Sequence, residues 1–309
     1  MRIPPRRIGG LLLSAVLGLS LLTPGTAHAA AWHSVPLPFL WWQNRIEDIA
    51  AAGPGSVWIA GVQGYIPGLP LPVSYGNPVV RRWDGSGWKE YPLNGWTGQG
   101  SIYEVAAAPG EVWVMGGGYM ARFDGAAFQK VAPPPHVSDI EAGAGGVYAT
   151  AWSDGTAYKW NGSGWDPSPL PPDALWTGDA YETVDPPAAE PVRAAANGPS
   201  GLYALADLDP LDDIAARVWR KTAGGWSEVP VPAGLLARTI TQDATGRLWA
   251  AGGISNEYSV YSLDGTTWTK QYGPAISGVY QLVAVPGTGT VWGRGFGPPL
   301  GDPQITTNS

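Results

Sequence analysis

Five tryptophans stand outside any repeated sequence pattern, in segments that we expect to be connections between strands. They are Trp41, Trp42, Trp96, Trp152 and Trp176. Flat aromatic rings stack on sugar rings, and nearby carboxylates accept hydrogen bonds from sugar hydroxyls. We therefore expect these tryptophans, with Asp179, Asp209 and Asp212, to bind extracellular carbohydrate. The alternative is that the aromatic rings cover the ends of the sheets and the acids keep that surface soluble.

The acidic run "DLDPLDD" (residues 207–213) raises the question of a metal site, because carboxylate oxygens are the ligands that calcium prefers. Its spacing matches no EF-hand loop, and Pro210 restricts how the oxygens could converge. We expect a solvated acidic loop and no cofactor, with calcium as the less favoured alternative.

Catalysis has weak support in the sequence. His33 and His136 are the histidines that follow the predicted signal peptide, and neither lies in a pattern typical of a catalytic triad. The acids could still supply the paired carboxylates of a glycoside hydrolase or lyase. We favour non-catalytic binding, keep that enzyme and a protein-interaction platform as alternatives, and assign no catalytic residue.

A repeated unit provides the framework for these residues. An alternating apolar stretch, a Gly-rich turn and then Val or Leu before an aromatic residue recur six times, for example in "IYEVAAAPGEVW" (residues 102–113) and "VSDIEAGAGGVY" (residues 137–148). A second half-unit, as in "RWDGSGWKEYP" (residues 82–92), places Asp-Gly or Asn-Gly between apolar runs, which is a strong hairpin signal. Each unit therefore predicts four strands, a to d, and six units predict an all-β, six-bladed β-propeller.

Strand direction divides the predicted ring into two faces. The d-to-a and b-to-c connections share one face, here called the loop face, and the a-to-b and c-to-d turns share the other, the turn face. The five tryptophans and the longest connections (residues 62–78, 171–190 and 206–216) are predicted on the loop face. The segment 171–190 could also hide the strands of a seventh blade. Long connections are more often functional than not.

Eleven other tryptophans occupy repeat positions, and we expect them to pack between blades. They are Trp32, Trp58, Trp83, Trp88, Trp113, Trp160, Trp165, Trp226, Trp249, Trp268 and Trp292. The strand-d pattern also occurs early, as "WHSVP" (residues 32–36), while the sixth unit lacks a full second half. We therefore expect this N-terminal strand to complete the last blade and close the ring.

Two units resemble the kelch-type propellers. The segments "VWVMGGGYMARFDGAAFQKVAPP" (residues 112–133) and "LWAAGGISNEYSVYSLDGTTWTKQYGP" (residues 248–274) resemble the kelch pattern of Gly-Gly after strand b, an aromatic residue on strand c and a tryptophan on strand d. The resemblance implies a propeller and no particular activity.

The N-terminal segment predicts export. Arg2, Arg6 and Arg7 precede an apolar run (residues 8–22) and the small-residue pattern Ala27-His28-Ala29, so residues 1–30 are a predicted signal peptide and residues 31–309 a single propeller domain. Removing three arginines changes the net charge from −7 to −10, which disfavours nucleic acid as a partner. The absence of cysteine excludes disulfides. We expect a secreted monomer without a membrane anchor.

Overall fold

The computed structural model describes residues 32–37, 40, 43–64, 76–151, 153, 155–170, 174–178, 180–184, 192–209, 212–232, 235–254, 257–271, 278–297 and 302–309. The predicted signal peptide lies outside these residues. In the part of the chain that is described, no helix has the length and apolar character needed to cross a membrane.

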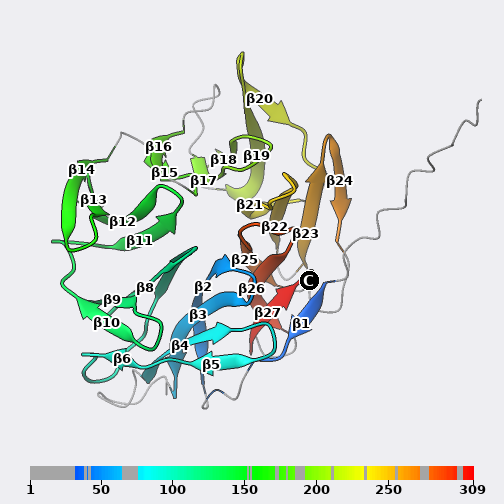
Figure 1. Cartoon of the computed structure of the whole chain (residues 1–309). Helices are drawn as coiled ribbons and strands as arrows, with labels where there is room; N and C mark the ends of the chain where they lie inside the picture. Colours follow the sequence, from blue (N-terminus) through cyan, green and yellow to red (C-terminus); the bar gives the residue numbers. More distant parts are fainter. Residues whose placement is uncertain are drawn as a thin grey trace, which may run out of the picture.

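Six four-stranded blades surround a central axis in the described structure (Figure 1). The first blade contains β2 (Arg45–Gly53), β3 (Ser56–Gln63), β4 (Asn77–Trp83) and β5 (Trp88–Glu90). The second contains β7 (Glu104–Ala108), β8 (Glu111–Gly116), β9 (Tyr119–Phe123) and β10 (Phe128–Val131), and β6 (Leu93–Asn94) adds to its outer edge. The third contains β11 (Asp139–Gly143), β12 (Gly146–Ala151), β13 (Thr156–Trp160) and β14 (Trp165–Pro169).

The remaining three blades complete the ring. The fourth contains β17 (Val192–Ala196), β18 (Tyr203–Asp209), β19 (Asp212–Thr222) and β20 (Gly225–Val229). The fifth contains β21 (Ala237–Gln242), β22 (Leu248–Ile254), β23 (Glu257–Asp264) and β24 (Thr267–Lys270). The sixth contains β25 (Val279–Ala284), β26 (Val291–Gly297), β27 (Asp302–Thr307) and β1 (His33–Val35). The predicted all-β, six-bladed propeller of four-stranded blades is confirmed.

The closing strand lies where the sequence predicts it. Strand β1 pairs antiparallel with β27, with Ser34 opposite Thr306, and so becomes the outer strand of the sixth blade. The two ends of the chain thus meet in one sheet, and the ring has no open blade at this junction.

The segment 171–190, expected to be a connection or to hide strands, contains a hairpin. Strands β15 (Ala174–Trp176) and β16 (Tyr181–Thr183) form a two-stranded sheet between the third and fourth blades (Figure 1). Leu175 packs towards the fourth blade, and Tyr181 packs with residues of the third. The hairpin therefore occupies a place in the ring between two complete blades.

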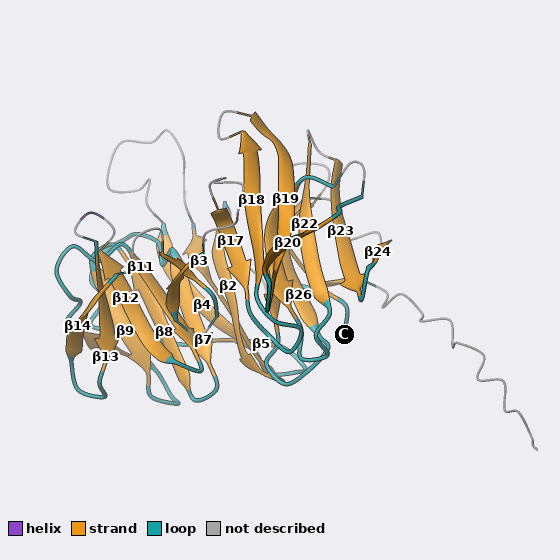
Figure 2. Ribbon diagram, turned by 90° about the horizontal axis from the view of Figure 1, so that it is seen from above, coloured by secondary structure: helices purple, strands orange, loops and turns teal. Residues whose placement is uncertain are grey.

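The expected connection 206–216 is instead mostly strand. Strands β18 and β19 continue their pairing to Asp209 opposite Asp212, and they extend beyond the neighbouring blades (Figure 2). The expectation of a long connection at 206–216 was wrong, because β18 continues to Asp209 and β19 begins at Asp212.

The repeated tryptophans form the packing between blades, as predicted, and all eleven belong to hydrophobic clusters. Trp113, which has no exposed surface, packs with Trp160 and Trp165 at ring-centroid distances of 4.9 and 5.3 Å. The indole of Trp88 also donates a hydrogen bond of 3.1 Å to the Pro36 carbonyl, which ties the first blade to the closing strand.

The "RWDGSGWKEYP" segment is a structural hairpin. Asp84 Oδ1 accepts hydrogen bonds from the backbone N–H groups of Ser86 and Gly87 at 2.8 and 2.9 Å. These bonds, together with one from the Ser86 hydroxyl, lower the pKa of Asp84 to about 2. Gly85 has a φ of 100°, which favours glycine at this position. The motif is therefore part of the scaffold.

Candidate functional site

The inner strands of the six blades surround a central pocket of about 710 Å³. Residues of β2, β7, β11, β17, β21 and β25 line it, together with Trp176, Thr177 and Gly178 at the end of the β15–β16 hairpin. A pocket of this size accommodates a small ligand or a short segment of a longer one.

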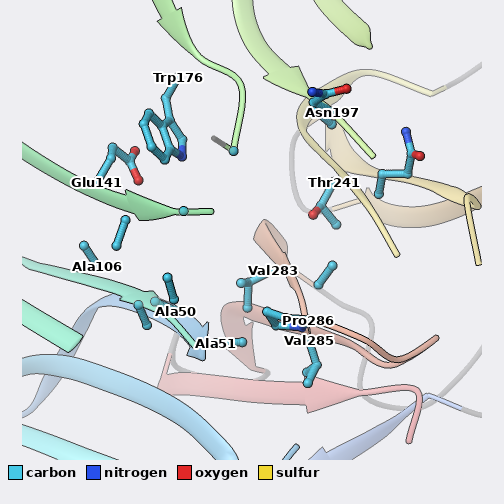
Figure 3. A pocket seen from close by; sticks show the side chains of 18 of the residues that line it. Ala50, Ala51, Ala106, Glu141, Trp176, Asn197, Thr241, Val283, Val285 and Pro286 are labelled. Atoms are coloured by element: carbon cyan, nitrogen blue, oxygen red, sulfur yellow. The ribbon is translucent and has the colours of Figure 1, made fainter. Parts of the chain in front are cut away.

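The wall of this pocket differs from side to side (Figure 3). Glu141 and Trp176 lie beside each other on one side, and Asn197 and Thr241 contribute polar side chains further round the wall. Alanine, valine and proline side chains line much of the remainder. They include Ala50, Ala51, Ala106, Val283, Val285 and Pro286. An aromatic plane thus lies near several hydrogen-bonding groups and faces an apolar wall.

Asp48, on β2, joins three consecutive blades. Its Oδ2 accepts a hydrogen bond of 2.8 Å from the Val105 backbone N–H in the second blade. Its Oδ1 accepts bonds from the Gln281 side chain in the sixth blade at 2.6 Å and from the Ile49 N–H at 2.8 Å. Burial nevertheless raises the pKa of Asp48.

The same arrangement recurs in the next two blades. Glu104, on β7, accepts a bond of 3.0 Å from the Ile140 N–H of the third blade. Asp139, on β11, accepts a longer bond of 3.4 Å from the Tyr181 hydroxyl of the hairpin. Asp48, Glu104 and Asp139 therefore each connect their blade to the element that follows it. Together with Glu141 they line the central pocket and are called the channel acids.

Glu141, on β11, is different. Within the described structure its side chain makes no hydrogen bond or ion pair, and the residue is partly exposed and lines the pocket. Desolvation, followed by the charges of Asp139, Asp48 and Glu104, raises its pKa well above the usual value. Glu141 is thus a carboxyl group without the partners that hold its neighbours.

Burial favours the protonated form of Asp48, Glu104 and Glu141 and so raises the pKa of each. Desolvation raises the pKa of Glu104 to about 9, with additional contributions from Asp139 and Asp48. Glu104 is therefore protonated at neutral pH.

No group of three or more metal-ligating side chains suited to hold a metal ion occurs among the described residues.

Exposed aromatic residues lie on the loop face, near the start of the inner strands. Tyr103 precedes β7 and is 40% exposed, whereas Phe296, on β26, is 46% exposed and stacks on Tyr280 with ring centroids 5.0 Å apart. Arg294 lies 4.6 Å from the centroid of the Tyr280 ring, and an ion pair joins Arg45 to Glu47 on the first blade. This face therefore combines exposed aromatic residues with charged groups.

Two of the five predicted tryptophans can be placed. Trp96 lies on the loop face and packs edge to face on Tyr119, with centroids 5.1 Å apart, while its Nε1 donates to the Gly98 carbonyl at 3.0 Å. Trp96 and Trp176 belong to different hydrophobic clusters, so the structure does not bring them together.

The predicted position of Trp176 was wrong. The hairpin turn that follows it accepts a hydrogen bond at the Thr177 carbonyl from the Asn197 N–H, just after β17, and therefore lies at the turn face. The error arose because segment 171–190 was treated as one connection that stays on the loop face. Strand β15 instead runs from the loop face towards the turn face.

The other predicted site residues remain predictions. Trp41, Trp42, Trp152 and Asp179 lie outside the described residues. Asp209 and Asp212 face each other at the ends of β18 and β19, where the structure describes the backbone alone.

The four channel acids were missed, although three of them leave a signal in the sequence. Asp48, Glu104 and Asp139 each precede Ile or Val at the same place in the first three repeats, within "IEDIA", "IYEVA" and "VSDIE". An acid at a repeated strand-a position indicates a side chain near the channel. Glu141 has no counterpart in the other repeats.

No family model matches the chain, and no curated protein matches it. The β-propeller domain of Cps50 (Swd1) from Myceliophteria thermophila is similar in structure, with a TM-score of 0.55 and 10% identity over 89% of this chain and 99% of that one. A structure of YCF48 bound to D1 peptide has a TM-score of 0.43 and 18% identity, over 85% and 78% of the two chains. A luciferin-regenerating enzyme has a TM-score of 0.45 and 11% identity, over 90% and 94%. The likeness to the Cps50 domain supports the propeller fold, which is compatible with a binding platform and specifies no ligand.

Proposed function

We propose that the protein is a non-catalytic binding propeller that takes carbohydrate into its central channel. The observation that carries the proposal is the pocket of about 710 Å³ in which Trp176 lies beside Glu141 (Figure 3). Sugar-binding sites combine an aromatic surface, on which the apolar face of a sugar ring rests, with polar groups that bind its hydroxyls.

Each part of the wall has a role in this proposal. Trp176 stacks on a sugar ring, and its own ring is supported by Tyr148 and Tyr181 at centroid distances of 5.8 and 5.3 Å. Glu141 and Asn197 exchange hydrogen bonds with hydroxyl groups. Tyr103, where the pocket approaches the loop face, offers a further aromatic contact to a longer chain.

A glycan array tests the proposal with protein lacking residues 1–30. We expect binding that Trp176→Ala weakens at least about tenfold, because ring stacking and desolvation are lost. Trp96→Ala is the control, since that indole covers the second blade outside the pocket. Binding lost on Trp96→Ala and kept on Trp176→Ala would move the site to the loop face, and an array without hits would reject carbohydrate as the ligand.

A polysaccharide-cleaving enzyme is the second candidate. The raised pKa of Glu104 keeps a proton on that carboxyl group at neutral pH, which is the state that a general acid requires. The Ile140 N–H already occupies one of its oxygens, however, which favours a structural role. Release of shortened products from bound glycans, lost in Glu104→Gln, would establish the enzyme in place of the binding protein.

We also propose that the protein is exported and works as a monomer. The sequence pattern of residues 1–30 supports cleavage after Ala29 or Ala30. N-terminal sequencing of protein recovered from the medium would then begin at residue 30 or 31, and light scattering would give the mass of one chain. Retention of residues 1–30 on the mature protein would contradict export by cleavage.

A further inference from the structure

The joint between the third blade and the β15–β16 hairpin contains an acid, Glu141, whose side chain has no hydrogen-bond or ion-pair partner in the described structure. We propose that Glu141 and Trp176 form a subsite for a primary ammonium group, so that the carbohydrate bound in the channel is an amino sugar. This inference rests on the proposed carbohydrate function and specifies its ligand.

The first argument is the contrast between Glu141 and its neighbours. Asp48 accepts three hydrogen bonds and Glu104 accepts one from the next blade, whereas Glu141 accepts none from the described residues. Partial desolvation of an ionisable group without a partner is costly, and an oppositely charged partner removes much of that cost. The described residues do not supply that partner, so a ligand is the natural source.

The second argument is the aromatic ring beside this acid. Figure 3 shows the Trp176 indole next to the Glu141 carboxyl group, both at the pocket wall. An ammonium group is attracted by the face of an indole ring and donates charge-assisted hydrogen bonds to a carboxylate. An ammonium group of a ligand can therefore contact both side chains. A neutral hydroxyl gains neither the attraction to the indole face nor the charge-assisted hydrogen bond.

The surrounding charges favour a cation at this position. Asp139 and Asp48 lie close enough to affect the ionisation of Glu141, and both are acidic. Lys159 is a cationic residue of the same blade, but its Nζ lies over the Tyr148 ring, 5.2 Å from the centroid, and it forms no ion pair with Glu141. The acids around Glu141 therefore favour a cationic group of a ligand over a neutral one at this position.

Isothermal titration calorimetry with three β-1,4-linked tetrasaccharides tests the inference. The glucosamine, N-acetylglucosamine and glucose tetramers share a backbone and differ at carbon 2, where they carry ammonium, acetamide and hydroxyl groups. We expect the glucosamine tetramer to bind at least about tenfold more tightly than either neutral tetramer.

Two variants identify the group responsible. Glu141→Gln keeps the size of the side chain and should abolish the preference for the glucosamine tetramer over the two neutral tetramers. Glu182→Gln removes an exposed acid of β16 outside the pocket, and should retain the preference. Circular dichroism of both variants confirms that they fold.

The possible outcomes separate the two proposals. Equal binding of all three tetramers, or a preference that survives Glu141→Gln, would overturn the ammonium subsite and leave the carbohydrate proposal standing. A preference lost equally in both variants would show that net charge, and not this subsite, attracts the amine, and would also overturn it. Failure of all tetramers and of the glycan array would overturn both proposals.

Discussion

The joints between the first three blades differ from the joint between the third blade and the β15–β16 hairpin. In the former, a channel acid accepts a backbone N–H from the next blade, as Asp48 does from Val105 and Glu104 from Ile140. In the latter, Asp139 meets a tyrosine hydroxyl at 3.4 Å, and Glu141 has no partner among the described residues.

The difference separates acids that hold the ring together from an acid that is available to a ligand. A carboxyl group that satisfies backbone donors cannot be removed without leaving those donors unpaired. The inner strand of the shortened element, β15, has three residues where β7 and β11 have five each, so it has fewer backbone N–H groups to offer a channel acid. The incomplete element is therefore the best location for a site.

The largest contrast is expected between two tryptophans. Trp113→Ala should lower the free energy of unfolding by about 3–5 kcal/mol, because the residue is fully buried between Trp160 and Trp165. Trp176→Ala should cost less than half as much, since its ring is half-buried and reaches the pocket. Urea denaturation measures both, and equal losses would mean that the hairpin joint is as structural as the complete ones.

A second contrast compares two acids. Asp48→Ala leaves the N–H groups of Ile49 and Val105 and the amide of Gln281 without their acceptor, and should cost about 2–4 kcal/mol of unfolding free energy. Glu141→Ala breaks no hydrogen bond within the described structure and should cost less than about 1 kcal/mol. Chemical denaturation at pH 7 measures the pair, and a larger loss for Glu141→Ala would contradict the distinction.

The pH dependence of Glu104 refines the comparison. Its pKa rises from 4.5 to about 9 on folding, so the folded state retains a proton that the unfolded state releases. Its contribution to stability is therefore complete below about pH 4.5 and is lost as the pH rises towards 9. Glu104→Gln keeps an acceptor for the Ile140 N–H and should unfold at a higher temperature than the wild type at pH 8.

The control for Glu104→Gln is the same comparison at pH 4, where both proteins carry a neutral side chain and should melt within about 1–2 °C of each other. Scanning calorimetry at the two pH values provides the measurement. A difference between the proteins that does not change with pH would show that ionisation of Glu104 is not responsible.

The smallest effect is expected at the weak bond of the hairpin joint. Tyr181→Phe removes the hydroxyl that donates to Asp139 at 3.4 Å and should lower the free energy of unfolding by less than about 1 kcal/mol. Asp48→Asn is the comparison, since it weakens a joint with shorter bonds. Equal losses in thermal unfolding would indicate that the two joints are equally strong.

The sequence predicts the scaffold well because the repeats encode it locally. The Asp-Gly turn at Asp84, the strand-b tryptophans and the early strand at "WHSVP" each depend on residue types and periods that one sequence displays. The same residue types and periods correctly predict six four-stranded blades and the strand that closes the ring.

The candidate site was predicted less well because it depends on departures from the repeat. Trp176 was assigned to the loop face, since a two-stranded hairpin without the repeat pattern resembles a connection. The partners of Asp48 come from β7 and β25, so its structural role depends on pairing between distant parts of the chain. Composition cannot distinguish such an acid from Glu141.

The pairing of β1 with β27 has a consequence for the order in which the molecule assembles. Ser34 lies opposite Thr306, so the first described strand has no sheet to join until the last strand has been synthesised. Ring closure is therefore a late event that brings the most distant parts of the chain together, and contacts of this kind slow folding. Deleting β1 (His33–Val35) or β27 (Asp302–Thr307) would therefore open the same blade, so the two strands share one tolerance for truncation.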